Sequence, residues 1–422
     1  MKTFAPLFGA IALLASPATA KSDSPPSPER REPVVILVSI DGFRADYLDR
    51  GITPNLSTLA ASGISAAMRP SFPSKTFPNH WALVTGKVPD RNGIVANGFE
   101  DPAHPGEKFT MASDEPYWWD EAEPIWVTAE KAGIHTATMF WPGSNVAWGG
   151  TLVKQPWKTV SGGIRPRDWQ QFNGAVSPMQ RVDAVLDWLR RPASNRPKFV
   201  TLYFDQVDTA GHRHGPDDAQ TNAAITDVDG DIGKLVAGLR ELGQPANLIV
   251  VADHGMAAVS SDRVIALDTV ADPSLYKLGE AGPFAALTPT EGDDEKLAVA
   301  LVRPHEHMQC WRKQDIPARL HYGRNPRIAP FFCLAEPGWQ IAATSPDKAS
   351  NGGSHGYDNA APEMAALFVA NGPAFAPRGK LGSFDNVDVA PLLRDLLHLP
   401  PATDGDGSDA PFRGALRSPT KR

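Results

Sequence analysis

Cysteine is nearly absent from this chain of 422 residues, which contains only Cys310 and Cys333. Neither has a partner cysteine at zinc-finger spacing, so a cysteine-ligated structural zinc site is excluded. In an oxidising compartment these two residues can form one disulfide. Two free buried thiols are the alternative, because the sequence does not show how far apart the two side chains lie.

Long apolar runs and an excess of positive charge are also lacking. Beyond the N-terminus no stretch of about 18 apolar residues occurs, so we expect no membrane anchor. The formal net charge is -7, whereas binding nucleic acid through a basic surface needs an excess of Lys and Arg. We therefore expect no nucleic-acid partner, although a local pocket can still bind a small nucleotide. The hydrophobic content of 42% is typical of a globular protein.

The first twenty residues have the pattern of a signal peptide, which we assign to residues 1–20. Lys2 gives a positive start, residues 4–15 are largely apolar, and Ala18-Thr19-Ala20 has the small-x-small form of a cleavage site. The apolar run is too short to span a bilayer. This segment predicts a protein exported to a bacterial periplasm or secreted from the cell.

The remainder of the chain divides by composition into a linker, one large domain and a tail. Residues 21–33 are rich in Ser, Pro and charge and predict a flexible linker. Residues 34–400 form the expected catalytic domain, and residues 401–422 a loose C-terminal tail.

Apolar, β-branched runs that alternate with helical patterns indicate the fold class. The run Val34–Ile40 is typical of a central strand of a parallel sheet. Further strands are predicted at His135–Trp141, Phe199–Phe204, Leu248–Ala252, Leu297–Val302 and Met364–Ala370. Helices are predicted after Ser177, over 219–242 and over Val389–Leu399. The pattern predicts an α/β fold with a doubly wound, mainly parallel central sheet and helices on both faces.

Carboxylates and imidazoles follow several of the predicted strands. In a doubly wound sheet, ligands bind outside the carboxyl ends of the strands. A single Asp at such a place is usually a turn residue or a helix cap, but several together suit zinc, which accepts nitrogen and oxygen ligands. Six residues could supply two sites of three protein ligands each: Asp41, Asp208, His212, Asp253, His254 and His355.

A nucleophile is suggested by the segment Ser74-Lys75-Thr76-Phe77-Pro78. Pro78 fits the start of a helix, so Thr76 is expected near a helix N-terminus. The unpaired backbone N–H groups there can hold phosphate oxygens. The alternative is that Thr76 merely caps the helix.

Taken together, these residues resemble the nucleotide pyrophosphatase/phosphodiesterase family of the alkaline phosphatase superfamily. The resemblance extends from Val34 to Leu399 and suggests a minimal bacterial member. Five motifs carry it, in the family's order: Ile40-Asp41-Gly42-Phe43-Arg44, Lys75-Thr76-Phe77-Pro78-Asn79-His80, Asp208-x-x-Gly211-His212-x-His214-Gly215, Asp253-His254-Gly255-Met256 and His355-Gly356-Tyr357-Asp358-Asn359.

The resemblance implies an alkaline phosphatase-like domain with two Zn²⁺ ions per subunit and Thr76 as the nucleophile. Asp41, Asp253 and His254 match the ligands of one zinc ion, which also contacts Thr76. The ligands of the second ion are matched by Asp208, His212 and His355.

The resemblance also implies a site for a nucleotide substrate. Asn97 matches an asparagine that contacts a phosphate oxygen. Phe77 and Phe172 match two aromatic residues that sandwich the nucleotide base, and the family usually has tyrosine where this chain has Phe172. The implied reaction is hydrolysis of a nucleotide phosphodiester or phosphoanhydride bond through a phospho-threonine intermediate, which releases a nucleoside 5′-monophosphate.

The sequence leaves alternatives open. Within the superfamily they are a phosphomonoesterase, a phosphonate hydrolase, a sulfatase and a phosphodiesterase that acts on lipid headgroups in the manner of a lysophospholipase C. A monoesterase must bind an additional anionic oxygen, for which Arg44 and Lys75 stand near the motifs. The alternative of a different class is a non-catalytic binding protein on a degenerate enzyme scaffold.

Overall fold

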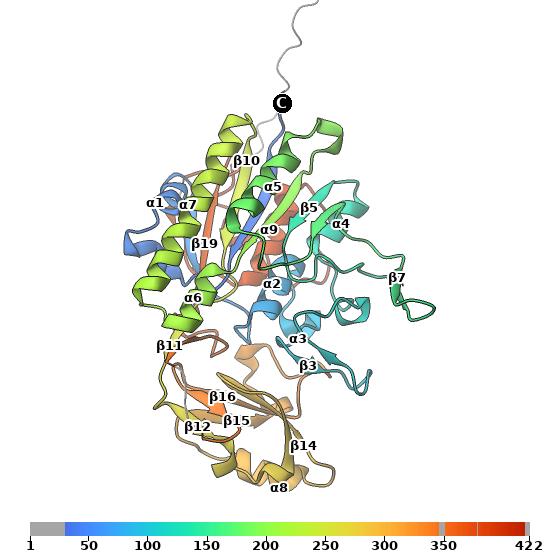
Figure 1. Cartoon of the computed structure of the whole chain (residues 1–422), viewed down its shortest axis with the longest axis vertical. Coiled ribbons are helices and arrows are strands. Elements are labelled where there is room, and N and C mark those ends of the chain that lie inside the picture. Colours follow the sequence, from blue (N-terminus) through green and yellow to red (C-terminus); the bar gives the residue numbers. More distant parts are fainter. Residues whose placement is uncertain (1–29, 346–350, 378, 418–422) are drawn as a thin grey trace, which may run out of the picture. The chain divides into compact units, whose positions relative to one another are not determined.

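A mixed sheet of eight strands forms the centre of the fold (Figure 1). The computed structural model describes residues 30–345, 351–377 and 379–417. The predicted signal peptide at 1–20, and the linker as far as residue 29, lie outside the described residues. The strands in spatial order are β20 (Gly379–Lys380), β2 (Ile64–Met68), β19 (Ala366–Asn371), β10 (Ala246–Val251), β1 (Val34–Ile40), β9 (Phe199–Phe204), β5 (Thr136–Met139) and β8 (Asp168–Gln170).

The central part of this sheet is parallel, as the sequence predicts. β1 pairs in parallel with β10 on one side and β9 on the other. All seven residues of β1 are buried, which explains its near-continuous apolar sequence. Among the described strands of this sheet, β19 runs against both of its neighbours, β10 and β2. The predicted sheet of mainly parallel strands is therefore confirmed.

The helices form two groups that flank the sheet. In one group, α7 (Ala219–Glu241) packs against α1 (Pro54–Ser62), α5 (Pro178–Arg190) and α6 (Gln206–His214). In the other, α2 (Thr76–Thr85) packs against α4 (Ile125–Lys131) and α9 (Val389–Leu396). Ser177 caps α5 through a capping box with Gln180, as its sequence predicts.

The predicted strand at Leu297–Val302 is wrong, because this segment lies in helix α8 (Asp294–Leu301). Leu297, Ala298 and Leu301 are buried, which is the spacing of one helical face. Acidic residues in the first turn also favour a helix. A short apolar run does not distinguish a strand from a buried helix, and here the tertiary packing decides.

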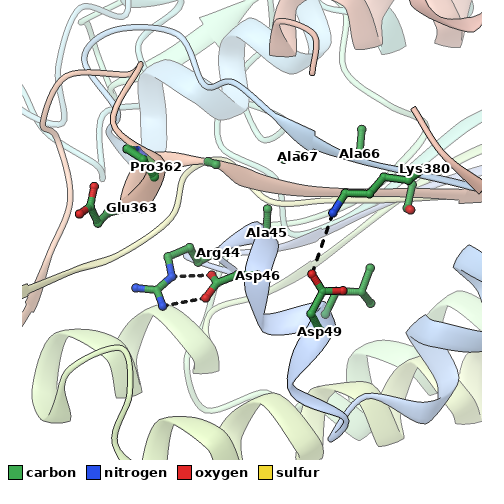
Figure 2. A pocket seen from close by; sticks show the side chains of 12 residues that line it. Arg44, Ala45, Asp46, Asp49, Ala66, Ala67, Pro362, Glu363 and Lys380 are labelled. Atoms are coloured by element: carbon green, nitrogen blue, oxygen red, sulfur yellow. Dashed lines mark hydrogen bonds and ion pairs between the residues drawn. The ribbon is translucent and has the colours of Figure 1, made fainter. Parts of the chain in front are cut away.

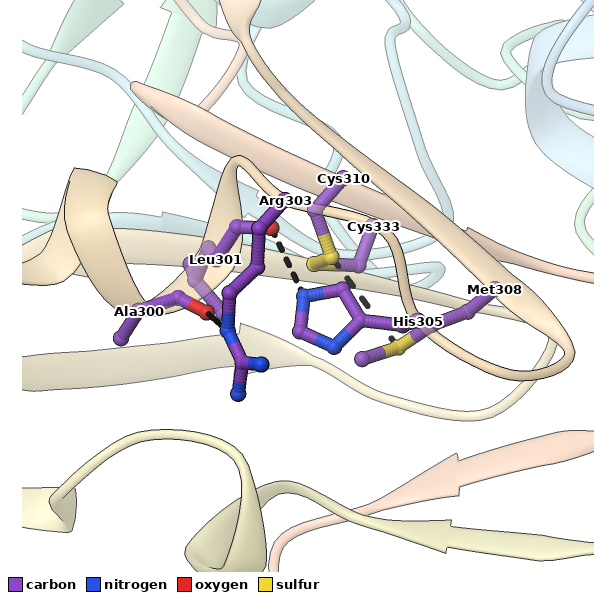
Figure 3. The surroundings of a disulfide bond; sticks show 7 residues. All are labelled: Ala300, Leu301, Arg303, His305, Met308, Cys310 and Cys333. Atoms are coloured by element: carbon purple, nitrogen blue, oxygen red, sulfur yellow. Dashed lines mark hydrogen bonds between the residues drawn. A yellow bond between two sulfur atoms is a disulfide. The ribbon is translucent and has the colours of Figure 1, made fainter.

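A second, antiparallel sheet has its own small core. Its strands in spatial order are β13 (Tyr276–Glu280), β14 (Phe284–Pro289), β16 (Phe331–Ala335) and β15 (Met308–Arg312). Figure 1 shows β14, β15 and β16 together with α8. Cys310 and Cys333 lie directly opposite each other in β15 and β16 and form a disulfide, which Figure 3 shows beside Met308 and His305. Of the two alternatives for the cysteines, the structure contains the disulfide.

Removing this disulfide should lower the free energy of unfolding by about 3 kcal/mol, because the cross-link closes a loop and restricts the unfolded chain. The two cysteines are separated by 23 residues, which sets the size of that loop. Urea unfolding of a Cys310→Ala/Cys333→Ala variant measures the effect. A loss well below about 1 kcal/mol would show that the cross-link contributes little.

The segment predicted as a loose tail, residues 401–422, is described as far as residue 417, and its part around Phe412 is anchored to the core. Phe412, in the short helix η10 (Ala410–Phe412), is fully buried. Its ring contacts Phe368 and Phe384, with centroid distances of 5.5 Å and 4.9 Å. Burial of this single aromatic ring in the core fixes a segment that its Gly and Ser content predicts to be mobile.

Candidate metal centre

The candidate ligands meet at the carboxyl ends of three neighbouring parallel strands. Asp41 directly follows β1, and Asp253 and His254 follow β10. After β9, helix α6 carries Asp208 and His212. Because β10, β1 and β9 are adjacent and parallel, their following residues reach the same edge of the sheet.

His355 reaches this edge from a different part of the chain. It follows β18 (Gly352–Ser354), a short strand that pairs with β11 (Ala257–Val259) just after the Asp253-His254 segment. This pairing brings a residue that is distant in the sequence next to His254, and the two imidazole rings stack with centroids 3.5 Å apart.

Asp41, Asp253 and His254 form the first tight group. His254 Nε2 lies 3.0 Å from Asp253 Oδ2 and 3.4 Å from Asp41 Oδ1. The ligand atoms of the three residues all lie within 4.8 Å of one another, and all three residues are buried. The structure thus brings together the residues that the resemblance implies for one metal ion.

Asp208, His212 and His355 lie beside the first group. Asp208 Oδ1 is 3.4 Å from His212 Nε2 and 3.8 Å from His355 Nε2. The tightest second group contains Asp208, His355 and His254, so His254 lies between the two sets. His212 is farther out, with its side chain 40% exposed, and its ring centroid is 4.9 Å from that of His355.

Backbone carbonyls fix the orientation of all three imidazoles. Each Nδ1 lies close to one carbonyl oxygen: His355 at 2.8 Å from Ser74, His212 at 2.8 Å from Gly353, and His254 at 2.9 Å from Gly255. Because a carbonyl can only accept, each Nδ1 carries the proton and donates it. In the neutral form of each ring, Nε2 is then the nitrogen with a free lone pair that can bind a metal ion.

The electrostatics of the site fit bound cations. Asp41 Oδ1, Asp208 Oδ1 and Asp253 Oδ2 are buried without a hydrogen-bond partner among the described residues. Burial, followed by repulsion from the neighbouring carboxylates, raises the pKa of Asp41 and of Asp253. Burial also lowers the pKa of His355, so its imidazole is neutral. Three carboxylate oxygens without a hydrogen-bond partner among the described residues, together with imidazole nitrogens, match the donors that divalent metal ions such as zinc prefer.

Thr76 lies at the centre of this arrangement. Its Oγ1 is 3.3 Å from His254 Nε2, and it is the first residue of α2. The N-cap of that helix is Lys75, and the side chain of the N-cap makes no capping hydrogen bond. Thr76 therefore lies near a helix N-terminus, as predicted, and it does not have the capping role that was the alternative.

Asn97 lies next to this helix end, but its contact differs from expectation. Its Oδ1 accepts the backbone N–H of Phe77 at 2.9 Å. That N–H follows Thr76 and was expected to be available to a phosphate oxygen, so the prediction is wrong for this one donor. Because Asn97 Oδ1 is engaged, its Nδ2 is the atom of the amide that can donate to a ligand.

A family model for type I phosphodiesterase / nucleotide pyrophosphatase matches residues 35–358. The chain belongs to this family. An uncharacterized pyrophosphatase/phosphodiesterase of Schizosaccharomyces pombe is 38% identical to it over 403 residues, which cover 90% of this chain and 79% of that protein. A bis(5′-adenosyl)-triphosphatase of Xenopus laevis is 38% identical over 366 residues, which cover 86% of this chain and 77% of that protein.

A solved structure shows the same fold. Murine ectonucleotide pyrophosphatase/phosphodiesterase 5, an inactive threonine-to-alanine variant in complex with AMP, superposes with a TM-score of 0.84 at 34% identity. The match covers 92% of this chain and all of that one. The chain is therefore a hydrolase with an alkaline phosphatase-like fold. The expectation of a minimal bacterial member is not borne out, since these relatives come from yeast, frog and mouse.

The two aromatic residues implied for the nucleotide base lie in separate groups. Phe77 contacts Phe109 and Trp119, with ring centroids 6.1 Å and 6.0 Å away. Phe172 contacts Phe140 and Tyr203, at 5.4 Å and 5.8 Å, and is 52% exposed. Among the described residues, no ring contact joins Phe77 to Phe172.

Two residues around the candidate ligands had no role in the sequence-based expectations. The hydroxyl of Tyr203, in β9, donates to Asp41 Oδ2 at 2.6 Å. His80 is fully buried, with Nδ1 2.9 Å from Thr76 O and Nε2 2.8 Å from Ser39 Oγ. Burial lowers the pKa of His80 to about 3, so it is a neutral hydrogen-bonding residue. His80 stands four residues after Thr76, one helical turn away, and that spacing could have indicated the contact.

The two basic residues that a monoesterase could use for its additional anionic oxygen both have carboxylate partners in the structure. Arg44 lines a pocket beside the short helix η1 (Ala45–Arg50), where it pairs with Asp46 (Figure 2). It also donates to Met256 O at 3.1 Å. Lys75 Nζ is 3.8 Å from Glu280 Oε1 at the end of β13. None of the candidate ligands lines the pocket of Figure 2.

Within the part of the chain that the structure describes, no helix is both long and apolar enough to cross a membrane. The longest of the α-helices, α7, has 23 residues but carries acidic and basic side chains along its length.

Proposed function

We propose that this family member is a two-zinc phosphodiesterase and nucleotide pyrophosphatase with Thr76 as its nucleophile. The observation that carries the proposal is the position of Thr76 Oγ1, 3.3 Å from His254 Nε2, beside three Asp residues that each have one buried carboxylate oxygen without a hydrogen-bond partner among the described residues. The threonine-to-alanine variant of the mouse relative is inactive, which supports a threonine nucleophile in the family.

Two sets of three residues would hold the metal ions. Asp41, Asp253 and His254 suit one zinc ion, which Thr76 also reaches, and Asp208, His212 and His355 suit the second. When bound, zinc lowers the pKa of a coordinated hydroxyl group and neutralises charge on the phosphoryl group and the leaving oxygen. The mixed oxygen and nitrogen donors favour zinc over magnesium or calcium.

The reaction proceeds in two displacements at phosphorus. In the first, Thr76 Oγ1 forms a bond to phosphorus, and the bond to the leaving oxygen breaks with its electron pair. The proton of the threonine hydroxyl is released and protonates the leaving oxygen. In the second, water forms a bond to phosphorus, the bond to Thr76 Oγ1 breaks, and Oγ1 regains a proton. The products are a nucleoside 5′-monophosphate and the departing alcohol or phosphate.

Asn97 and the two aromatic residues bind the substrate in this proposal. The Nδ2 group of Asn97 donates to a phosphoryl oxygen, since Oδ1 is held by the N–H of Phe77. Phe77 and Phe172 stack on the nucleotide base from opposite sides. The AMP complex of the mouse relative and the bis(5′-adenosyl)-triphosphatase name of the frog relative support a small nucleotide substrate.

We further propose that the protein is exported, to a periplasm or the cell exterior. The disulfide between Cys310 and Cys333 supports this, because such bonds persist in oxidising compartments.

A rate comparison of three chromogenic substrates tests the proposal. With zinc supplied, kcat/KM for the p-nitrophenyl ester of thymidine 5′-monophosphate should exceed that for methyl p-nitrophenyl phosphate by about 10-fold or more, because stacking on a base is worth about 1–3 kcal/mol. p-Nitrophenyl phosphate should be the poorest of the three. Equal rates on the two diesters would remove the nucleotide site from the proposal, and a preference for the monoester would replace the diesterase by a phosphatase.

A further inference from the structure

Tyr203 connects the metal centre to the aromatic residue Phe172. It is the fifth residue of β9 and pairs with Ser39 of β1. Ser39 stands two residues before Asp41 in the sequence. Its hydroxyl donates to Asp41 Oδ2 at 2.6 Å, and its side chain is partly exposed.

The hydrogen bond gives the two carboxylate oxygens of Asp41 different surroundings. Oδ2 is occupied by Tyr203, whereas Oδ1 is buried, has no hydrogen-bond partner among the described residues and lies 3.4 Å from His254 Nε2. A carboxylate held at one oxygen cannot rotate freely, so the other oxygen stays directed toward the metal cluster. Such outer hydrogen bonds typically orient ligands and raise metal affinity.

The ring of Tyr203 makes two further contacts. Its centroid is 5.8 Å from that of Phe172, with the ring planes at 78°. On the metal side, it is 5.3 Å from the ring of His80, which binds the carbonyl of Thr76. Phe172 is 52% exposed, and the ring of Tyr203 is one of its contacts, beside the ring of Phe140 at 5.4 Å and the Arg181 guanidinium at 5.6 Å.

We propose that Tyr203 is a positioning residue with two separable roles. Its hydroxyl orients Asp41 for the metal ion, and its ring holds Phe172 in place for the nucleotide base. This inference rests on the proposed function, because it assumes that the cluster binds zinc and that Phe172 stacks on a base.

Two substitutions separate the roles. Tyr203→Phe removes the hydroxyl and keeps the ring, so zinc affinity should fall by about 10- to 100-fold. At saturating zinc, this variant should keep the wild-type preference for the thymidine diester over methyl p-nitrophenyl phosphate. Tyr203→Leu keeps much of the side-chain volume but loses the aromatic ring. Its preference for the thymidine diester over methyl p-nitrophenyl phosphate should be several-fold lower than that of Tyr203→Phe.

Zinc affinity is measured on the metal-free protein by competition with a chromogenic chelator, which does not depend on turnover. Tyr117→Phe is the matched control, because it also removes a phenol that donates to a carboxylate, that of Glu107, which is not among the candidate ligands. This control should leave zinc affinity and substrate preference unchanged.

Each role can be overturned separately. Wild-type zinc affinity in Tyr203→Phe would overturn the orienting role of the hydroxyl. Equal substrate preference in Tyr203→Leu and Tyr203→Phe would overturn the support of Phe172. If the wild-type protein binds zinc but cleaves none of the three substrates, the proposed function fails, and the affinity comparison still tests the hydroxyl.

Discussion

Replacing Thr76 with alanine should lower kcat by a thousandfold or more, which corresponds to about 4 kcal/mol of activation free energy. Thr76 Oγ1 is the hydroxyl that lies against the candidate ligand His254, at the N-terminus of α2. In the proposed mechanism, no phospho-enzyme can form without this hydroxyl, and only direct attack by water on the substrate remains. Steady-state kinetics with the thymidine diester at saturating zinc measure the loss.

Two further variants make this result specific. Thr76→Ser keeps a hydroxyl and should retain much more activity than Thr76→Ala. Thr85→Ala removes a hydroxyl from the last residue of the same helix, where it donates to Trp81 O at 2.6 Å and accepts the backbone N–H of Lys87 at 3.4 Å, and should leave kcat within about threefold of wild type. Near-normal turnover by Thr76→Ala would refute the mechanism.

Replacing Asp253 with asparagine should lower turnover as strongly as Thr76→Ala does. The same change should stabilise the metal-free protein. The change removes one ligand, so the protein should bind one zinc ion tightly in place of two, and kcat should fall by a thousandfold or more. Asparagine can still accept the Gly42 N–H that bonds Asp253 Oδ1 at 3.1 Å. Elemental analysis of dialysed protein and kinetics measure both effects.

The stability effect depends on pH in a defined direction. Burial raises the pKa of Asp253 above its ordinary value of 3.8. A carboxyl group with a raised folded-state pKa contributes stability that is complete below its unfolded-state pKa and is lost as the pH rises through its folded-state pKa. In the presence of a chelator, the wild-type protein should therefore lose stability relative to Asp253→Asn as the pH rises above 3.8. Zinc should reverse the order, because it binds the wild-type ligands and so stabilises the folded state.

Urea unfolding at several pH values, with and without zinc, measures this crossover. Asp187→Asn is the control, since Asp187 is exposed and pairs with Arg190 on the surface of α5. It should change neither the zinc content nor the sign of the pH dependence. If metal-free Asp253→Asn is less stable than wild type at neutral pH, burial of the Asp253 charge beside the other carboxylates does not limit the stability of the metal-free protein.

The sequence predicted the elements whose patterns have one interpretation. The β-branched run Val34–Ile40 favours a buried strand, and it lies at the centre of the sheet. The signals at Ser177 fix the start of α5 by local hydrogen bonds. The strand predicted at Leu297–Val302 was wrong, and the burial of Phe412 was not predicted. Both features depend on packing with residues that are distant in the sequence.

For the site, the sequence by itself determined which residue types could bind a metal ion, their order along the chain and the family that they indicate. It did so because the donor atoms belong to the residue type and because the end of a strand is marked by the neighbouring residues. Only the tertiary structure decided that His254 lies between both ligand sets and that the N–H of Phe77 is bound by Asn97. It also decided that Tyr203 holds one oxygen of Asp41. These contacts join residues far apart in the sequence through side-chain orientations, which depend on how the strands and loops pack, and no local pattern encodes them.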